Sequence, residues 1–365
     1  MRQNHRMLYT IYLGSVIFCL SCIYIITAPN ESEYSSMNYR TNLEFIVEGK
    51  NNISWRDIRQ LTARSYLDAT MKYRILPHVH LASHWHELSM RPLCVASQSS
   101  FDRANLMVEL ATNWPGIINL ALFVPGPELP LALYYLEYLK RCYPVIEERM
   151  TIHFVYPLKS KFEAHLENGY TTTLNWTCTD EPDTALDQLL GFVPNKFMYW
   201  RKKLLYPQNM LRNVAREHCQ NEWITCVDMD MFFPSPADNG EHKVAESLQQ
   251  FLNSSAAMSC KNCAFVLPTY EIQSNVSHVP RNKTELLEFV EKGDARQFHN
   301  VTYPQGQEMS DLNTWEKLGV KDSEVSIAYA AKPFEWKYEP IYIARRGTPR
   351  FDERYVGFGT DRVEQ

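Results

Sequence analysis

The 365-residue sequence lacks the features of several common protein classes. Its longest basic run is only Arg201-Lys202-Lys203 and its formal net charge is −5, so a nucleic-acid-binding surface is not expected. No internal repeat is apparent, which argues against an array of small units. Cys260-x-x-Cys263 has no second Cys-x-x-Cys to accompany it, so a local disulfide or two thiols are favoured over a four-ligand zinc site.

One long apolar segment is present, close to the N-terminus. Residues 7–27 contain no charge, and as a helix they would cover roughly 31 Å, enough to cross a bilayer. A cleaved signal peptide is the alternative, but its apolar region is usually only about 7–15 residues long. Basic residues precede the segment and acidic residues follow it. We therefore expect a single-pass type II membrane protein with residues 1–6 in the cytoplasm, residues 7–27 in the membrane and the remaining residues in the lumen of the secretory pathway.

The sequence after this anchor suits a secreted environment. Six Asn-x-Ser/Thr sequons would be accessible to glycosylation in the lumen, at Asn52, Asn175, Asn253, Asn275, Asn282 and Asn300. Seven cysteines follow the anchor, so some should pair, although the odd number leaves at least one over. Residues 28–90 are expected to form a stem with a short helix within residues 54–76.

Four histidines lie near the end of this stem, at positions 78, 80, 84 and 86. Histidines two apart share one face of a strand and histidines four apart share one face of a helix, so a metal site is conceivable. The segment offers no partner carboxylate and no clear scaffold, and we do not assign a site to it from sequence alone.

Residues 91–365 alternate between short apolar runs and amphipathic segments. Strands are expected at Leu93–Ala96, Ile117–Val124, Thr151–Val155 and Trp223–Val227, and helices at Asp102–Thr112, Leu131–Arg141 and Asn209–His218. This alternation predicts an α/β domain with a mainly parallel sheet. The last strand runs directly into Asp228-Met-Asp230, at the carboxyl end of a strand, where open α/β sheets bind nucleotides.

Asp228 and Asp230 offer hard oxygen ligands for a divalent ion that would neutralise the diphosphate of a sugar nucleotide. The motif alone is weak, because a chain of this size contains about one such pair by chance. A solvated turn is one alternative, although the flanking residues are too apolar for an ordinary surface loop. An aspartyl-phosphate phosphatase is another, but that class prefers Thr or Val where this chain has Phe232.

Several longer blocks make the assignment more specific. They are Gln98-Ser-Ser-Phe-Asp-Arg103, Tyr206-Pro-Gln-Asn-Met-Leu-Arg-Asn-Val-Ala-Arg-Glu217, Val227-Asp-Met-Asp-Met231, Val266-Leu-Pro-Thr-Tyr-Glu271, Asn282-Lys-Thr-Glu-Leu-Leu287, Tyr338-Glu-Pro340 and Pro349-Arg-Phe-Asp-Glu-Arg-Tyr-Val-Gly-Phe-Gly359. Together they resemble glycosyltransferase family 49, which includes β-1,4-glucuronyltransferases and the C-terminal domain of LARGE-type enzymes. The residue sequences of these blocks resemble the glucuronyltransferase branch more than the LARGE branch.

The resemblance implies a GT-A fold and a Mn²⁺-dependent, inverting transfer from UDP-glucuronate to a glycan acceptor on a glycoprotein, of the xylose-terminated O-mannosyl type. Inversion requires a general base, for which Asp352 is the first candidate and Glu339 the second. The candidate donor-binding residues are Arg212, Asn209, Gln98 and Arg103. Arginine grips diphosphate and carboxylate bidentately, although for Arg103 a surface ion pair is an equal alternative.

The resemblance also exposes a difference. Family members continue beyond the Gly-x-Gly block with a histidine that completes the metal site, whereas the last histidine of this sequence is His299. We therefore expect the catalytic domain to lack the family's C-terminal segment. Two alternatives follow: a catalytically weak lumenal partner that forms a complex with related glycosyltransferases, or the same mechanism with another UDP-sugar.

Overall fold

The structure is a computed structural model that describes residues 43–47, 50–51, 63–158, 172–193, 195–319, 324–331 and 335–357. The predicted tail, the anchor at residues 7–27 and part of the predicted stem lie outside these residues, as does the end of the chain. Within the described residues, none of the helices has both the length and the apolar character needed to cross a membrane.

The strands are β1 Leu43–Val47, β2 Lys50–Asn51, β3 Tyr66–Leu67, β4 Tyr73–His80, β5 Leu93–Ser100, β6 Ile118–Phe123, β7 Met150–Pro157, β8 Thr172–Trp176, β9 Trp223–Asp228, β10 Ala264–Leu267, β11 Tyr270–Ile272, β12 Ala295–Gln297 and β13 Ile341–Arg345. The helices are α3 Trp85–Leu88, α4 Met107–Asn113, α5 Glu128–Cys142, α6 Pro144–Arg149, α7 Pro182–Leu190, α8 Asn195–Arg201, α9 Gln208–Glu217, α10 Lys243–Leu252, α11 Ser255–Ser259, α12 Lys283–Lys292 and α13 Leu312–Lys317, with 3-10 turns η1 Phe101–Leu106, η2 Pro304–Gly306 and η3 Glu308–Ser310.

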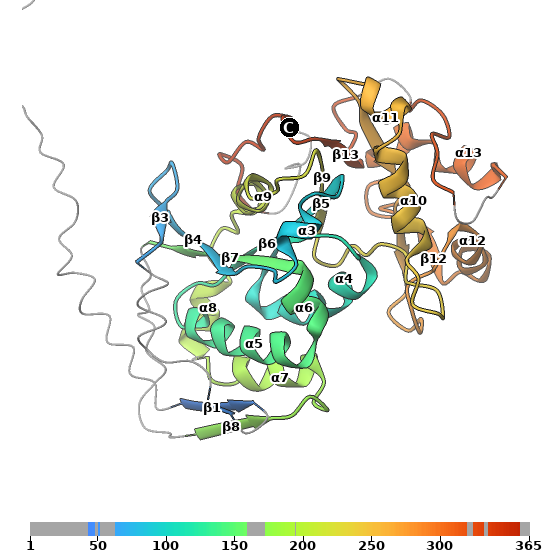
Figure 1. The fold of residues 1–365 in the computed structure, drawn as a ribbon. Helices are drawn as coiled ribbons and strands as arrows, with labels where there is room; N and C mark the ends of the chain where they lie inside the picture. The colour runs from blue at the N-terminus through green and yellow to red at the C-terminus, as the bar shows by residue number, and fades with distance from the viewer. Residues whose placement is uncertain are drawn as a thin grey trace, which may run out of the picture. The chain divides into compact units, whose positions relative to one another are not determined.

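One large mixed sheet organises these elements (Figure 1), with the strand order β10-β13-β9-β5-β6-β7-β4-β3. The four central strands β9, β5, β6 and β7 are parallel, and the flanking strands β13 and β4 run antiparallel to their neighbours. All four parallel strands lie where the sequence predicts strands. This α/β architecture with a large mixed sheet fits the expected GT-A-like fold.

The alternation of side chains along the central strands produces an apolar core on each face of the sheet. One set, which includes Leu93, Val95 and Leu120, packs against α4 and α5. The opposite set, which includes Cys94 and Ala96, packs against α9. Figure 1 shows α4, α5 and α6 on one side of the sheet and α9 on the other. Burial on both faces explains why these parallel strands read as continuous apolar runs.

The N-terminal edge of the sheet differs from the prediction. Residues 63–76 contain β3 and the start of β4, whereas residues 54–62, the rest of the segment expected to contain a short helix, lie outside the described residues. Because β4 pairs with β7, the sheet begins before the predicted domain boundary at residue 91. The register of β4 shifts between Leu76 and His80, around Pro77, and such a break removes the regular alternation by which a strand is recognised.

The C-terminal half adds a smaller helical region to the sheet. The sequence Asn282-Lys-Thr-Glu285 begins α12, where the Asn282 side chain accepts a hydrogen bond from the backbone N–H of Glu285 at 2.9 Å. The helix ends at Gly293, whose φ of 81° lies in the left-handed region that glycine adopts at low cost. Strands β11 and β12 pair beside this helix as a separate two-stranded ribbon.

Six of the seven cysteines that follow the predicted anchor form disulfides: Cys94–Cys219, Cys142–Cys178 and Cys260–Cys263. The last pair confirms that Cys260-x-x-Cys263 is a local disulfide. The first joins β5 to the residue that follows the C-cap of α9, across 125 residues of sequence. A cross-link over so long a loop strongly restricts the unfolded chain.

We expect the double variant Cys94→Ala, Cys219→Ala to lose about 4 to 5 kcal/mol of unfolding free energy, from the entropy of closing a loop of this length. The matched double variant Cys260→Ala, Cys263→Ala opens a loop of only three residues and should lose less than about 2 kcal/mol. Urea denaturation of the three proteins measures both values. Equal losses in the two variants would contradict this account.

Candidate functional site

The candidate site lies where the carboxyl ends of β5 and β9 meet. These neighbouring parallel strands are in register, with Gln98 opposite Asp228. Strand β5 lies between β6 and β9, so the chain leaves β5 toward one side of the sheet and returns later on the other side. The crevice at such a reversal of strand order is where open α/β sheets bind nucleotides. The predicted motif Asp228-Met-Asp230 therefore stands at the position that its strand context indicated.

Two side chains hold the carboxylate of Asp228. Gln98 Nε2 donates to Asp228 Oδ1 at 2.8 Å, and Arg212 Nη2 donates to the same oxygen at 3.2 Å. Gln98 and Arg212 are 5 % and 4 % exposed, whereas 26 % of the Asp228 side chain is exposed. Buried donors thus orient a carboxylate that solvent can still reach.

Tyr206 fixes the amide of Gln98 from the other side. Its hydroxyl donates to Gln98 Oε1, so the amide nitrogen must be the group that faces Asp228. Burial, together with the nearby carboxylate of Asp228, raises the pKa of the Tyr206 hydroxyl well above its ordinary value, so it remains a donor. Tyr206 is the first residue of the sequence block Tyr206–Glu217, but residue type alone gave no reason to assign it a role.

Helix α9 connects Asp228 to the C-terminal part of the described chain. Arg212 Nη1 donates to Asn209 Oδ1 at 3.2 Å, and Asn209 Nδ2 donates to the carbonyl of Asp352 at 2.9 Å. Asn213 exchanges two hydrogen bonds with the backbone of Phe351. The sequence-predicted residues Arg212 and Asn209 are therefore brought together, both on one helix.

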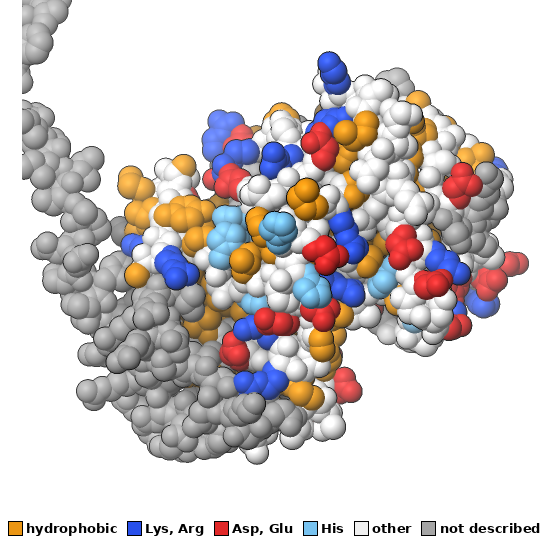
Figure 2. Space-filling model, viewed as in Figure 1, with side chains coloured by type: hydrophobic (Ala, Val, Ile, Leu, Met, Phe, Trp, Pro, Cys, Tyr) orange, Lys and Arg blue, Asp and Glu red, His pale blue; other side chains and the backbone are white. Residues whose placement is uncertain are grey.

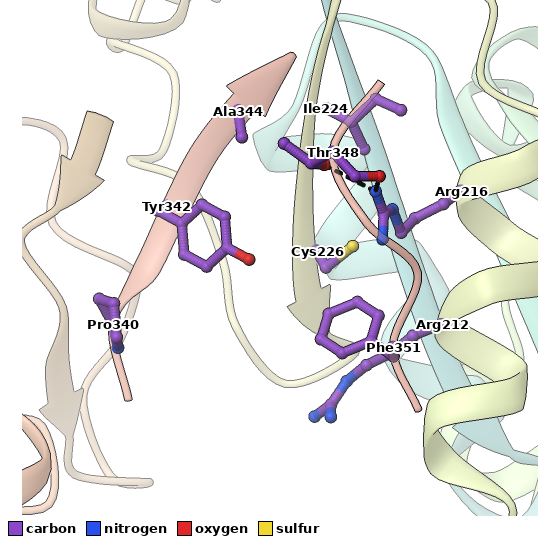
Figure 3. A pocket seen from close by; sticks show the side chains of 9 residues that line it. All are labelled: Arg212, Arg216, Ile224, Cys226, Pro340, Tyr342, Ala344, Thr348 and Phe351. Carbon is purple, nitrogen blue, oxygen red and sulfur yellow. Dashed lines mark hydrogen bonds between the residues drawn. The ribbon is translucent and has the colours of Figure 1, made fainter. Parts of the chain in front are cut away.

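A small cavity of about 30 Å³ lies between α9, β9, β13 and the segment 348–351 (Figure 3). The guanidinium groups of Arg212 and Arg216 lie 5.3 and 5.5 Å from the centre of the Phe351 ring. Arg216 also donates to the carbonyls of Thr348 and Pro349 at 3.0 and 2.7 Å. A cavity of this size is far smaller than the roughly 300–1,000 Å³ of a typical ligand pocket, and its walls support the site.

Asp230 is the exposed member of the aspartate pair. Its Oδ2 accepts a hydrogen bond from Arg103 Nη2 at 2.8 Å, with 45 % of the Asp230 side chain and 55 % of the Arg103 side chain exposed. An ion pair this exposed contributes only about 0–1 kcal/mol. The surface ion pair considered for Arg103 is thus what the structure contains, and its small energy lets Arg103 exchange one anionic partner for another.

The two candidate bases are placed differently. The side chain and backbone N–H of Arg354 hydrogen-bond to Asp352 and lower the pKa of its carboxyl to about 2. A carboxylate with so low a pKa accepts a proton poorly while that pair persists. Glu339 lies in the segment that precedes β13, where its backbone N–H donates to the carbonyl of Gly306 at 2.9 Å.

A cluster of three ionisable side chains next to the site was not identified from the sequence. Arg201 at the end of α8 contacts Asp102 in the turn after β5 and Glu128 at the start of α5. Glu128 is fully buried, and this burial outweighs the nearby Arg201 and raises the pKa of its carboxyl to about 8. The sequence feature that could have revealed this group is the acidic residue Glu128 within the apolar segment around Pro127 and Pro130.

The carboxylates of Asp228 and Asp230 fit a divalent cation of the Mg²⁺ or Mn²⁺ type, because such ions prefer hard oxygen ligands. Both aspartates follow one strand end, and arginines now balance their charge. The ion pair of Asp230 is weak enough to yield to an ion. A bound ion of this kind would stabilise the negative charge of a departing diphosphate.

Comparisons with known proteins agree with this chemistry. Residues 92–365 match the family described as "Glycosyl-transferase for dystroglycan". The chain is 26% identical over 294 residues to the xylosyl- and glucuronyltransferase LARGE2 of Mus musculus, an alignment that covers 79% of this chain and 32% of LARGE2. It is 26% identical over 311 residues to the beta-1,4-glucuronyltransferase 1 of Bos taurus and of Homo sapiens, covering 84% of this chain and 69% of each relative. The chain thus spans about a third of the length of LARGE2.

We expect Glu128 to contribute a loss of stability as pH rises from about 4.5 to about 8, which the buried His153 and His218 oppose below about pH 6.5 because burial lowers their pKa values. The folded protein keeps the proton of Glu128 up to about pH 8, whereas the unfolded chain releases it near pH 4.5. The loss approaches about 1.4 kcal/mol per pH unit at most. Glu128→Gln cannot ionise, so it should lack this contribution, and its stability should change with pH by a different slope from that of the wild type. Urea unfolding at several pH values measures it, with exposed Glu246→Gln as the control. An unchanged slope in Glu128→Gln would count against this assignment.

Proposed function

Since the chain belongs to the family of glycosyl-transferases for dystroglycan, we propose that it transfers glucuronic acid from UDP-glucuronate to a glycan acceptor, with Mn²⁺ bound by Asp228 and Asp230. The acceptor in this proposal is a xylose-terminated glycan of the O-mannosyl type on a glycoprotein. The relatives named for glucuronyltransferase activity support the choice of donor.

The observation that carries the proposal is the position of Asp228. Its carboxylate stands at the carboxyl ends of two neighbouring parallel strands, and Gln98 and Arg212 hold one of its oxygens. A diphosphate bound at these strand ends needs a cation and fixed donors to offset its charge. Arg103 is the most exposed of the nearby guanidinium groups, and we assign to it contact with the diphosphate or with the carboxylate of the sugar.

The proposed reaction inverts the anomeric carbon in a single displacement. The acceptor hydroxyl oxygen forms a bond to that carbon while the bond from the carbon to the UDP oxygen breaks, and a protein carboxylate takes the hydroxyl proton. Asp352 can serve only if Arg354 releases it, because their pairing holds the pKa of Asp352 at about 2. Glu339 is the second candidate for this base.

We also propose that the protein acts in the Golgi lumen, anchored by residues 7–27. The three disulfides fit an oxidising compartment. Four of the predicted sequons have exposed asparagines, at Asn175, Asn253, Asn275 and Asn300. These features support the proposal. In the Golgi lumen the protein would share a compartment with related glycosyltransferases, and we propose these as partners in a complex.

We expect Asp228→Asn and Asp230→Asn each to lower transfer by at least about 10²-fold, because each removes negative charge from the proposed Mn²⁺ site. The assay incubates the purified chain with UDP-glucuronate, Mn²⁺ and a xyloside and quantifies the glycosylated product. Asp238→Asn is the matched control, since Asp238 is an exposed aspartate that pairs with Arg281. The control should retain full activity.

A donor panel separates this proposal from its alternatives. Product from UDP-xylose or UDP-N-acetylglucosamine, but not from UDP-glucuronate, would keep the mechanism and replace the donor. The absence of both product and Mn²⁺-dependent UDP binding would exclude the enzyme and favour the role of a catalytically weak partner. Full activity in Asp228→Asn would show that the metal is held elsewhere or is not required.

A further inference from the structure

A cluster of three histidines lies on the part of the sheet formed by β4 and β7. His78 comes from β4, His153 comes from β7, and His218 is the C-cap residue of α9. Ring nitrogens from the three side chains lie within 4.8 Å of one another. Strands β5 and β6 separate β4 and β7 from β9, which carries Asp228, so the cluster is distinct from the proposed donor site.

The backbone of β4 is irregular at this cluster. The register with β7 shifts between Leu76 and His80, and His78 has a φ of 51°, in the left-handed region that disfavours residues with a Cβ atom. The irregularity brings the backbone N–H of His78 to 3.1 Å from Nδ1 of His153. Such backbone strain often occurs at functional sites, where the surrounding structure imposes it.

Two ring nitrogens in the cluster lack the partners that buried polar atoms usually have. Nε2 of His153 and Nε2 of His218 are buried with no hydrogen-bond partner among the residues that the structure describes. The two rings stack with their centroids 4.0 Å apart, and the ring of His78 meets them edge-on at 5.0 and 4.6 Å. Apolar rings would pack here without the cost of the unsatisfied nitrogens.

The surroundings keep these imidazoles neutral, which is the form that binds metal ions. Burial lowers the pKa of all three rings, to about 4 for His218 and well below the ordinary value for His153. His153 is fully buried, whereas His78 is exposed and leaves a route from solvent to the cluster. Figure 2 shows several histidine side chains on the face that carries β4 and α3.

We propose that His78, His153 and His218 bind one Zn²⁺ ion. Imidazole nitrogen is a preferred ligand of Zn²⁺, and three such ligands leave the fourth tetrahedral position for a water molecule on the exposed side of His78. The buried Nε2 atoms of His153 and His218 are the ligand atoms from those two residues.

Binding requires a small rearrangement. Tetrahedral Zn²⁺ with bonds of about 2.0–2.1 Å brings its nitrogen ligands to about 3.4 Å from one another, so the rings must close in from their present separations. The proton of His153 must move from Nε2 to Nδ1, and the contact with the backbone N–H of His78 is then lost. The loss of this one hydrogen bond at an exposed strand residue costs less than three metal–nitrogen bonds contribute.

The bound ion would help to fix helix α9, which positions a side chain of the proposed donor site. His218 lies at the C-terminal end of α9, where the helix dipole favours a positive charge. The ion would tie this end of the helix to β4 and β7, next to the disulfide Cys94–Cys219. Arg212, which contacts Asp228, is on the same helix. We therefore assign the proposed Zn²⁺ a structural role.

His78→Asn tests the site with little risk to folding, because asparagine tolerates the left-handed conformation that His78 adopts. The purified full chain is dialysed against Zn²⁺ and then against metal-free buffer, and bound zinc is measured by elemental analysis. A second measurement titrates the metal-free chain with Co²⁺ and follows the intense visible absorption of four-coordinate Co²⁺. We expect binding more than about tenfold weaker in His78→Asn than in the wild type.

His84→Gln is the matched control, since His84 is an exposed histidine of the same segment that lies outside the cluster. It should bind Zn²⁺ and Co²⁺ as the wild type does. His218→Gln should show the same loss as His78→Asn. Zn²⁺ should raise the Tm of the wild type and of His84→Gln, but not that of the two cluster variants. The proposal is overturned if the wild type binds no Zn²⁺, or if His78→Asn and His218→Gln retain wild-type binding. None of these readouts depends on transfer activity.

Discussion

The position of one carboxylate, that of Asp228, depends on the pairing of two parallel strands. Gln98 can donate to Asp228 only because β5 and β9 lie side by side in register. That pairing in turn requires the reversal of strand order that places β5 between β6 and β9. Any change that separated these strands would remove Gln98 from Asp228 and disrupt the strand ends where a nucleotide is expected to bind.

Helix α9 is the second requirement of the site. It packs on one face of the sheet, contributes Arg212 to Asp228 and holds the segment 348–352 through Asn209, Asn213 and Arg216. A disulfide fixes the chain just beyond its C-terminal end. The helix thus couples the strand that carries the proposed metal ligand Asp228 to a segment that carries one of the candidate bases, and the proposed zinc would add a further attachment at the same end.

The two arginines beside Asp228 and Asp230 differ in burial and in the number of hydrogen bonds they make. Arg212 is almost fully buried and makes hydrogen bonds to Asp228 and Asn209, whereas Arg103 is exposed and makes only a weak ion pair with Asp230. An exposed arginine can change partners at low cost, but a buried one cannot move without leaving a carboxylate unpaired. We infer that Arg212 orients the site and that Arg103 is the group that responds when a diphosphate arrives.

The sequence by itself determined the four parallel strands, the α/β class and the position of Asp228 after a strand, because these depend on short apolar runs that alternate with amphipathic segments. It also grouped Gln98, Asn209 and Arg212 as site residues, through their motifs. Only the tertiary structure decided which atoms meet: the hydrogen bond from Tyr206 to Gln98, the pairing of Cys94 with Cys219, and the approach of His153 and His218 to His78. These partners are separated by 75 or more residues, and their contacts follow from strand order and from the irregularity in β4, neither of which leaves a local pattern in the sequence.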